Sequence, residues 1–421
     1  MKGIWKKTVA AALTAAMLTG CGSAGATSAD NTSSSGSGEG GSLNLWYNTY
    51  SYEDGLTALI EAFEKEHPDI DVTYEIKADG DYDSLLKTAV QSGSGPDLFW
   101  TNGTATSTMA DFAENEAIVD LSSDVDFSFI SEDAMKLATI DGAVYSVPWM
   151  TLDTRAVYYN KDMFAEHGWE IPKTFDEFET LLTTIKEAGI TPISLCYDSW
   201  TMLFAYEPIL SGYDPAYCEG LSDYSVKATD APAREAMQKM VDWAKAGYFG
   251  DNWFGVTDSS AQNLAFTTGN AAMNIAGSWD APTLAQNNPA LNFGAFSIPS
   301  KDGKTGLVGT SSNGFSVSAT SGNMEAAKAF AAFCATKEAQ QIWVTATQAV
   351  SATEEITASS DIANEITESG QGNIYRSWQN VLSSESKDGE ASNIWAEDFP
   401  KVFDDEMTVD ELMDEIAAVM N

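Results

Sequence analysis

Aromatic and polar side chains gather at points where short strands are expected to end. The runs are WYNTY at residues 46–50, WTNG at residues 100–103 and GSWD at residues 277–280. An indole supplies a large rigid face for stacking, and amide, hydroxyl and carboxylate groups pair with hydroxyls. Side chains of these types suit the reversible, non-covalent recognition of a polar solute that has an apolar face.

Residues for covalent or metal chemistry form no comparable pattern. The chain shows no nucleophile elbow and no Walker-type phosphate loop, and its two histidines, His67 and His167, sit at expected helix ends. The acids at 79, 81 and 83 imitate the start of a calcium loop, but Ser84 replaces its glycine and Val90 its closing glutamate. We expect no catalytic residue, no metal and no cofactor.

Two other functional classes are alternatives to a protein that binds a polar solute. Acidic residues are so abundant that a carboxylate pair is always available, so a surface glycoside hydrolase is neither supported nor excluded. An adhesive surface protein would not need aromatic side chains at strand ends.

One cysteine offers acylation chemistry. Residues 1–20 combine three lysines with a short apolar stretch, which is typical of an export signal and too short for a stable membrane span. The run Leu18-Thr19-Gly20-Cys21 resembles the lipobox of bacterial lipoproteins, in which the thiol receives a diacylglycerol. We expect Cys21 to begin the mature chain and to anchor it to the outer face of the cell membrane.

The next segment predicts a tether. Residues 22–42 are almost all Gly, Ser, Ala, Thr and Asn, so they cannot bury apolar surface and should form a flexible coil. The chain as a whole is 44% hydrophobic and 11% aromatic, which suits a packed body too large for one core.

The net charge of the chain limits the chemical classes of partner that it can bind. Removal of the leader takes the 22 basic and 62 acidic side chains to 19 and 62, a formal net charge of −43. Such a field repels nucleic acid and anionic surfaces. Arginine, the usual clamp for carboxylate or phosphate, occurs only at 155, 234 and 376, which favours a neutral or cationic ligand.

The pattern of apolar residues after the tether predicts β-α-β-α-β. Residues 43–46 and 70–76 alternate as strands, residues 53–67 have one apolar helical face, and a helix around residues 85–90 precedes a strand at 97–100. This order favours a parallel sheet covered by helices, with ligands beyond the carboxyl ends of its strands.

The second half continues in the same style. A hairpin is expected at Asp141-Gly142, a strand at 155–159, and a helix that opens with a capping box at Thr174 and ends at Gly189. Further strands are expected at 271–276 and 314–318, and helices at 324–344 and 408–420. Cys334 should lie on an apolar helix face, and Cys196 and Cys218 could form a disulfide, which spacing alone does not decide.

In order along the chain, these landmarks resemble the carbohydrate class of extracellular solute-binding proteins that serve ABC importers, the group of the maltose-binding proteins. The strings that carry the resemblance include GSGPDLFW, DGAVYSVPWMTLDTRAVYYNKDMF, FTTGNAAMNIAGSWD, SSNGFSVS and TVDELMDEI. It spans residues 42–421 and implies an α/β protein of the two-lobe type II fold, with the ligand cleft between lobes joined by crossing segments.

The resemblance also implies how the chain is divided. Residues 1–20 are the signal peptide and 21–41 the lipidated cysteine and linker. Residues 42–149 with 300–350 form the N-terminal lobe, and residues 150–299 with 351–421 form the C-terminal lobe.

Ligand contacts of the family fall on twelve positions of this chain. They are Tyr50, Ser51, Trp100, Thr101, Asn102, Asp153, Arg155, Asp198, Trp200, Trp279, Asp280 and Trp395. Trp378 competes with Trp395 for the last role, Trp200 and Trp378 could instead be core residues, Asp153 a solvated turn residue, and Arg155 half of a salt bridge between the lobes.

The resemblance thus implies a non-enzymatic, lipid-anchored and monomeric protein that captures a neutral sugar or oligosaccharide outside the cell and delivers it to ABC permease subunits. A polyol, peptide or polyamine is the alternative solute. The loop at residues 47–52 lacks the acid–lysine pair of maltose-binding proteins, so the ligand need not be maltose.

Overall fold

The structure is a computed structural model that describes residues 41–48, 52–77, 79–103 and 107–420. These belong to one compact unit, Glu39–Asn421. The signal peptide, Cys21 and the linker lie outside the described residues. None of the described helices combines the length and the apolar character that a membrane crossing requires.

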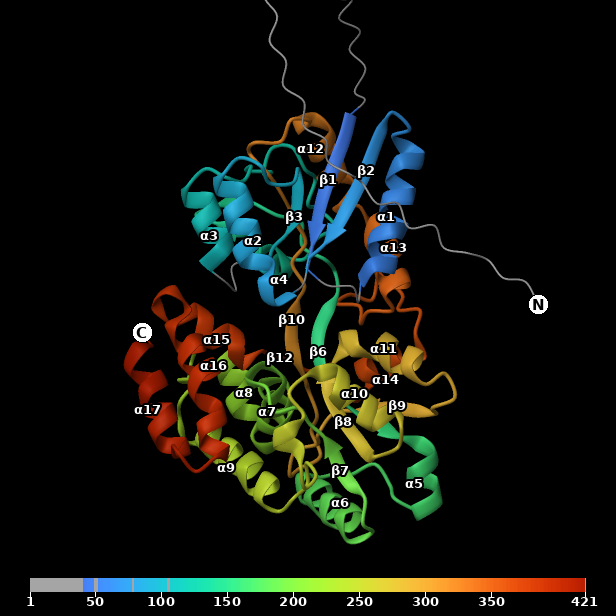
Figure 1. Cartoon of the computed structure of the whole chain (residues 1–421), viewed down its shortest axis with the longest axis vertical. Coiled ribbons are helices and arrows are strands. Elements are labelled where there is room, and N and C mark those ends of the chain that lie inside the picture. Colours follow the sequence, from blue (N-terminus) through green and yellow to red (C-terminus); the bar gives the residue numbers. More distant parts are fainter. Residues whose placement is uncertain (1–40, 49–51, 78, 104–106, 421) are drawn as a thin grey trace, which may run out of the picture. The chain divides into compact units, whose positions relative to one another are not determined.

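The smaller of two main sheets has the strand order β11-β3-β1-β2. Its strands are β1 (Gly41–Tyr47), β2 (Ile70–Ile76), β3 (Leu98–Trp100) and β11 (Phe315–Val317). β1 runs parallel to β2 and β3, as the β-α-β-α-β pattern predicts, whereas β11 returns antiparallel to β3. We call this sheet and the helices around it the first lobe (Figure 1).

Helices of the first lobe lie around this sheet, and most of them bury apolar side chains in its hydrophobic clusters. They are α1 (Glu53–Glu66), α2 (Asp79–Gln91), α3 (Ser107–Glu114), α4 (Glu132–Met135), α12 (Met324–Cys334) and α13 (Lys337–Thr347). Leu56, Leu59, Ile60 and Phe63 recur on one face of α1 and join the same hydrophobic cluster as Leu45 of β1. Helical periodicity thus fixes which side of α1 faces the sheet.

The helix expected over residues 324–344 is in fact two. α12 closes at the C-cap Ala335, and Thr336 caps α13 with its side chain, which accepts a hydrogen bond from the Ala339 N–H. A threonine hydroxyl offers the backbone this alternative to continued helix. The continuous apolar pattern concealed the break.

A small hairpin follows in the first lobe, where it was expected. β4 (Thr139–Ile140) and β5 (Ala143–Val144) pair antiparallel around Asp141 and Gly142. Both turn residues have positive φ, 50° and 85°, which a two-residue hairpin turn of this hand requires.

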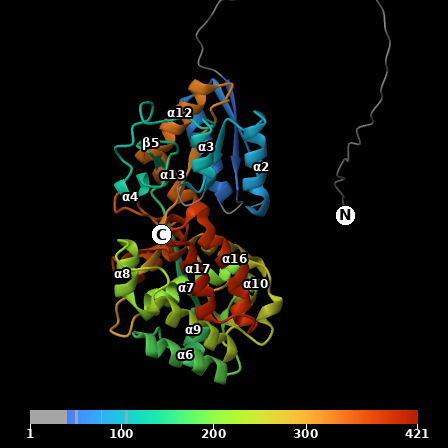
Figure 2. The same cartoon turned by 90° about the vertical axis from the view of Figure 1, so that its left-hand side faces the viewer.

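The larger sheet has the order β12-β10-β6-β8-β7, and β9 pairs with β6 off this path. Its strands are β6 (Leu152–Asn160), β7 (Thr191–Ser194), β8 (Ala271–Gly277), β9 (Phe293–Phe296), β10 (Leu307–Ser311) and β12 (Ile374–Arg376). We call this sheet and its helices the second lobe. In Figures 1 and 2 the two groups of elements lie apart, and Figure 1 shows the chain passing between them near β6 and β10.

Most of the helices of the structure surround this larger sheet. They are α5 (Lys161–His167), α6 (Phe175–Glu187), α7 (Ser199–Tyr213), α8 (Pro215–Ser222), α9 (Ala231–Lys245), α10 (Ser259–Thr267), α11 (Ala281–Asn287), α14 (Asp361–Ser369), α15 (Trp378–Ser384), α16 (Glu390–Phe403) and α17 (Val409–Val419). Short 3-10 turns lie at Trp253–Gly255, Ser278–Asp280 and Lys387–Gly389.

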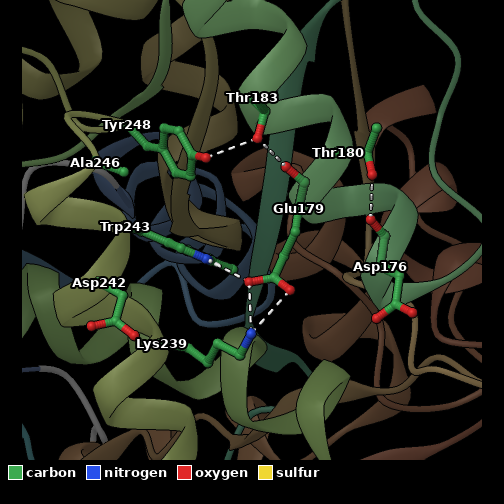
Figure 3. A pocket seen from close by; sticks show the side chains of 9 residues that line it. All are labelled: Asp176, Glu179, Thr180, Thr183, Lys239, Asp242, Trp243, Ala246 and Tyr248. Atoms are coloured by element: carbon green, nitrogen blue, oxygen red, sulfur yellow. Dashed lines mark hydrogen bonds and ion pairs between the residues drawn. The ribbon is translucent and has the colours of Figure 1, made fainter.

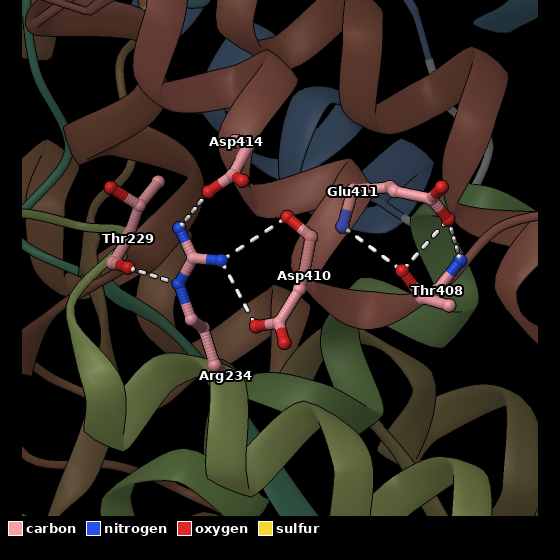
Figure 4. A network of polar contacts seen from close by, with 6 residues as sticks. All are labelled: Thr229, Arg234, Thr408, Asp410, Glu411 and Asp414. Carbon is pink, nitrogen blue, oxygen red and sulfur yellow. Dashed lines mark hydrogen bonds and ion pairs between the residues drawn. The ribbon is translucent and has the colours of Figure 1, made fainter.

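The start of the terminal helix α17 is stabilised by a capping box and by two ion pairs to a neighbouring helix. Thr408 and Glu411 form the predicted capping box, with the Thr408 hydroxyl accepting from the Glu411 N–H and the Glu411 carboxylate accepting from Thr408. Arg234 of α9 reaches Asp410 at 3.1 Å and Asp414 at 2.7 Å (Figure 4). These contacts fasten α17 to α9.

Strand pairing moves one expected lobe boundary. Residues 307–311 form β10, which pairs with β6 and β12 of the larger sheet, so the chain returns to the smaller sheet only between β10 and β11. The boundary expected at residue 300 therefore precedes the crossing by about ten residues, because the sequence pattern of β10 does not reveal which sheet it joins.

The cysteines among the described residues are free and buried. Cys196 and Cys218 form no disulfide, which settles the pairing that their spacing left open, and Cys334 lies in the core of the first lobe as expected.

Candidate ligand-binding site

A cavity of about 710 Å³ opens between the two lobes. The first lobe and the crossing segments contribute Asn48, Asp83, Trp100, Asn102, Leu137, Thr310, Ser311, Ser312 and Asn313. The second lobe contributes Asp153, Arg155, Asp198, Trp200, Thr201, Phe204, Ser259, Gln262, Asn263, Ala276, Trp279, Asp280, Ser377, Gln379 and Asn380. A solute in this cavity would touch both lobes.

Strand direction explains why distant segments meet here. β6 is antiparallel to β8 and β10, so its first residues lie beside the carboxyl ends of those strands. Arg155 is the partner of Gly277, and Asp153 is the partner of Thr310. The ends of β1 and β3 supply Asn48 and Trp100 from the other lobe. This agrees with the rule that α/β sheets bind ligands beyond the carboxyl ends of their strands.

Four aromatic rings line the cavity. Trp200, on α7, is 39% exposed, a large value for an indole, and Phe204 lies one helical turn further along. Trp279 contacts the Phe204 ring edge-on at 5.3 Å. Trp100 lines the cavity from the first lobe, and its indole N–H donates to the Asn313 carbonyl at 3.1 Å. The rings present apolar faces among polar groups.

The position of the Trp279 ring requires a residue without a side chain at position 277. The indole folds back over Gly277, and a Cβ added at that position would lie 2.2 Å from the Trp279 ring. Trp279 also packs against the hydrophobic cluster of the first lobe, although it belongs to the second. The ring therefore sits where the two lobes approach each other.

Asp280 is a carboxylate with a raised pKa. Burial raises the pKa of Asp280 to about 6, against hydrogen bonds from the Asn263 side chain at 2.9 Å and the Gly277 backbone, which lower it. Asn263 in turn accepts from Asn274, whose side-chain oxygen accepts from Gln262. This buried chain of amides fixes the orientation of Asp280.

Asp153 lies where the segments cross between the lobes. Burial raises the pKa of Asp153, and a hydrogen bond with Ser312, the charge of Arg155 and a hydrogen bond with Tyr52 of the first lobe oppose the rise. Asp153 is therefore a partly buried group in contact with both lobes, rather than the solvated turn residue that was the alternative.

Two further charged positions are engaged within the second lobe. Arg155 pairs with Glu207 of α7 at 3.1 Å, so the alternative of a salt bridge between the lobes is wrong. Asp198 is the N-cap of α7 and accepts from the backbone and the hydroxyl of Thr201, both at 3.0 Å. Both side chains still line the cavity.

The structure brings eight of the predicted contacts together and leaves two of the described ones away from the cavity. Trp100, Asn102, Asp153, Arg155, Asp198, Trp200, Trp279 and Asp280 line the cavity, whereas Tyr50 and Ser51 lie outside the described residues. Thr101 is buried and bonds Asn313, and Trp395 is fully buried against Phe399 and Trp378. Neither Thr101 nor Trp395 lines the cavity.

Trp378, the alternative to Trp395 as the last aromatic contact, does not line the cavity either. Trp378 is also core, and its indole N–H bonds the Ala228 carbonyl at 2.8 Å. On α15 it is the neighbours Gln379 and Asn380 that line the cavity. The α-helical turn directs adjacent residues to different sides, so a tryptophan in the correct segment need not face the ligand.

Several lining residues were not predicted. Phe204, Gln262 and Asn263 lie inside helices, and Ser312 and Asn313 follow β10. The string SSNG at residues 311–314 marks the last pair in the sequence. Nothing local distinguishes the helical residues, because their exposure to the cavity is a product of how α7 and α10 pack.

A second, open hollow lies away from the cavity, between α6 and α9 (Figure 3). Its centre is Glu179, whose carboxylate accepts from Lys239 at 3.0 Å and from the Trp243 indole N–H at 3.0 Å. Thr183 and Tyr248 bond each other at 2.8 Å. Its central polar groups satisfy one another, which is typical of a structural contact between helices.

Metal ligands do not cluster in the part of the chain that the structure describes. No group of three or more His, Cys, Asp and Glu side chains there could hold a metal ion.

Two α/β lobes around a polar cavity with aromatic walls define a binding protein of the two-lobe type II class. Residues 50–341 match the sequence profile of the family described as bacterial extracellular solute-binding protein, and the chain belongs to this family.

Relatives and solved structures agree with that assignment. Multiple sugar-binding protein of Streptococcus mutans is 28% identical over 294 residues, which cover 68% of this chain and 69% of that protein. Diacetylchitobiose binding protein DasA of Streptomyces coelicolor is 29% identical over 270 residues, 62% of this chain and 61% of DasA, so less than two thirds of DasA is matched. The solved structure of RafE in complex with raffinose has a TM-score of 0.71 at 23% identity over 90% of this chain and 98% of that one, which shows the shared fold.

Proposed function

We propose that the chain captures a neutral sugar or oligosaccharide outside the cytoplasm and presents it to the membrane subunits of an ABC importer. The observation that carries the proposal is the cavity wall, which Trp100 of one lobe lines together with Trp200 and Trp279 of the other. A sugar ring stacks its C–H face on an indole, and its hydroxyls pair with the carboxylates and amides between the rings.

The charge of the cavity supports an uncharged guest. Four lining residues are aspartates, at 83, 153, 198 and 280, and the one lining arginine is already paired with Glu207. An anionic sugar would therefore meet net negative charge without a free guanidinium to clamp it. Carboxylates that accept from sugar hydroxyls form the stronger, charge-assisted hydrogen bonds.

The relatives support the same class of ligand. Their names record binding of multiple sugars and of diacetylchitobiose, and one structural neighbour holds raffinose. A ligand that touches both lobes favours the closed arrangement by its differential affinity, and a permease can recognise that arrangement. In this mechanism the protein binds and releases its ligand without chemical change.

A binding screen tests the proposal. Purified chain without the leader is melted in the presence of monosaccharides, raffinose, diacetylchitobiose, maltotriose, xylo-oligosaccharides, polyols and peptides, and each stabilising solute is titrated by calorimetry and incubated for turnover. Saturable binding of a saccharide with no product supports the proposal. Turnover would instead support a hydrolase, and binding of no saccharide would refute the proposal.

A cationic solute is the second candidate, and the four aspartates favour it. Spermidine therefore belongs in the same screen. Preferential binding of spermidine over every saccharide would decide for the polyamine.

The proposal includes a lipid anchor on Cys21 and a monomeric body. Cys21→Ala should release the protein from the cell surface, and unchanged membrane retention would contradict the anchor. Light scattering of the chain without its leader should give the mass of one copy.

A further inference from the structure

We infer that Glu207, which does not line the cavity, is the positioning residue that sets the aromatic and polar wall of the second lobe. The inference rests on the proposed function, since it concerns the same site. Glu207 is 1% exposed in the middle of α7, so it acts on a ligand only through the groups it holds.

One carboxylate oxygen of Glu207 forms a buried ion pair with Arg155. The pair is 3.1 Å apart, and its side chains are 0% and 5% exposed, Glu207 and Arg155 respectively. The guanidinium lies 4.5 Å from the Phe204 ring centroid and 5.0 Å from that of Trp279. Both distances are within the range of cation–π attraction. Arg155 thus lies against both aromatic residues, and the charge of the carboxylate holds it there as an ion pair, without a hydrogen bond between Nε and the carboxylate oxygen.

The other oxygen of Glu207 fixes the start of α15. It accepts from the Ser377 hydroxyl at 2.9 Å and from the Gln379 backbone N–H at 3.1 Å. The Ser377 hydroxyl also caps α15 by accepting from the Asn380 N–H. Ser377, Gln379 and Asn380 all line the cavity. A single carboxylate therefore connects lining residues from β6, α7, the turn after β8, and α15.

Packing alone does not explain why a buried ion pair occupies this position between Arg155 and Glu207. Two buried charges cost desolvation energy, and apolar residues of similar volume often replace such pairs without loss of stability. A planar guanidinium, in contrast, can hold two rings and a carboxylate in one fixed geometry. Binding sites need such support behind the groups that touch the ligand.

The test is a double-mutant cycle. The probe is the saccharide that binds the wild-type chain most tightly in the screen above, measured by calorimetry well below the melting temperature. Glu207→Gln keeps the shape of the side chain and the acceptor for Ser377 but removes the charge that holds Arg155. We expect its dissociation constant to rise at least about tenfold, because removal of one partner leaves a buried charge unpaired.

The cycle separates positioning from a general loss of structure. In a Trp279→Ala background, Glu207→Gln should cost less than about threefold in affinity, since one of the two rings that Arg155 holds is already absent. Glu179→Gln is the matched control, because it breaks a lysine pair and a tryptophan bond in the hollow of Figure 3, and its affinity should equal that of the wild type.

Wild-type affinity in Glu207→Gln, or a loss that repeats in full in the Trp279→Ala background, overturns the inference. If Glu207→Gln shows no cooperative melting transition, Arg155→Lys takes its place, since an ammonium keeps the charge but cannot span Phe204 and Trp279. The same tenfold loss is then expected, and unchanged affinity overturns the inference. A wild-type chain that binds no saccharide refutes the proposed function before any variant is made, so the two failures are distinct.

Discussion

Affinity for the sugar should rise with pH through about 6, because Asp280 must ionise to act as a charged acceptor. The pKa of Asp280 is raised to about 6 by burial, and its carboxyl lines the cavity. At pH 5 only about one molecule in ten carries the ionised group, whereas nearly all do at pH 7.5. If the ligand binds the ionised form alone, the dissociation constant should be about tenfold higher at pH 5, or about 1.4 kcal/mol.

Folding stability should respond to the same group with the opposite sign. Between the ordinary pKa of 3.8 and about 6, the folded chain retains a proton on Asp280 that the unfolded chain has released. The contribution of Asp280 to the free energy of unfolding therefore falls as pH rises through this window and is constant above it. Acid thus strengthens this contribution to the fold while it weakens binding.

Calorimetric titrations from pH 5 to pH 8 at constant ionic strength measure the effect. Buffers of different ionisation enthalpy should report release of about half a proton per ligand bound at pH 6. Asp280→Asn should bind more weakly at pH 7.5 and lose the pH dependence. Asp153→Asn is the control, because burial also raises the pKa of Asp153 beside the same cavity. Retention of the slope in Asp280→Asn, or a flat profile in the wild type, would refute the reasoning.

Four further outcomes are expected. Trp200→Ala should weaken sugar binding by about 1 kcal/mol or more with little change in melting temperature, because the ring is 39% exposed in the cavity; equal affinity by calorimetry would remove it from the site. Gly277→Ala should weaken binding in the same titration, since a methyl group there collides with the ring of Trp279, and full affinity would contradict that packing. Arg234→Gln should lower the free energy of unfolding in urea by about 0.5–1 kcal/mol, an effect that added salt reduces because its two aspartate partners are largely exposed; a loss insensitive to salt would argue against the ion pairs. In Cys21→Ser, the three remaining thiols should react with Ellman's reagent only after unfolding, since burial raises the pKa of the Cys196 thiol to about 12; rapid reaction of the folded protein would contradict the burial.

Local signals were sufficient for most elements. The apolar face of α1 and the capping box of α17 were readable because each depends on residues three or four apart. At α6 only half of the predicted box forms: the Thr174 side chain caps the helix, but the Glu177 carboxylate accepts from the Lys173 N–H instead of the Thr174 N–H. The hairpin at Asp141-Gly142 was readable because few residues accept its two positive φ angles. The break between α12 and α13 was missed because Thr336 is compatible with either outcome until the tertiary structure selects one.

Part of the site could be predicted from the sequence, for a related reason. Residues that follow strands, such as Asn102, Trp279 and Asp280, were predicted because strand direction alone carries them to one edge of a sheet. Apart from Trp200 of α7, residues within helices were not. Phe204 and Asn263 face the cavity, whereas Trp395 and Trp378 do not, and each of these helices has an apolar pattern that permits either placement.

By itself, the sequence determined the α/β class, the polarity of the strand ends and an acidic composition unsuited to anionic partners, since all of these follow from short-range periodicity and from counting charges. Only the tertiary structure decided that β10 joins the larger sheet, that Arg155 pairs with Glu207 within one lobe, and that three indoles surround one cavity. These features depend on contacts between residues more than fifty positions apart. Such contacts are chosen by the packing of whole elements, which no local pattern encodes.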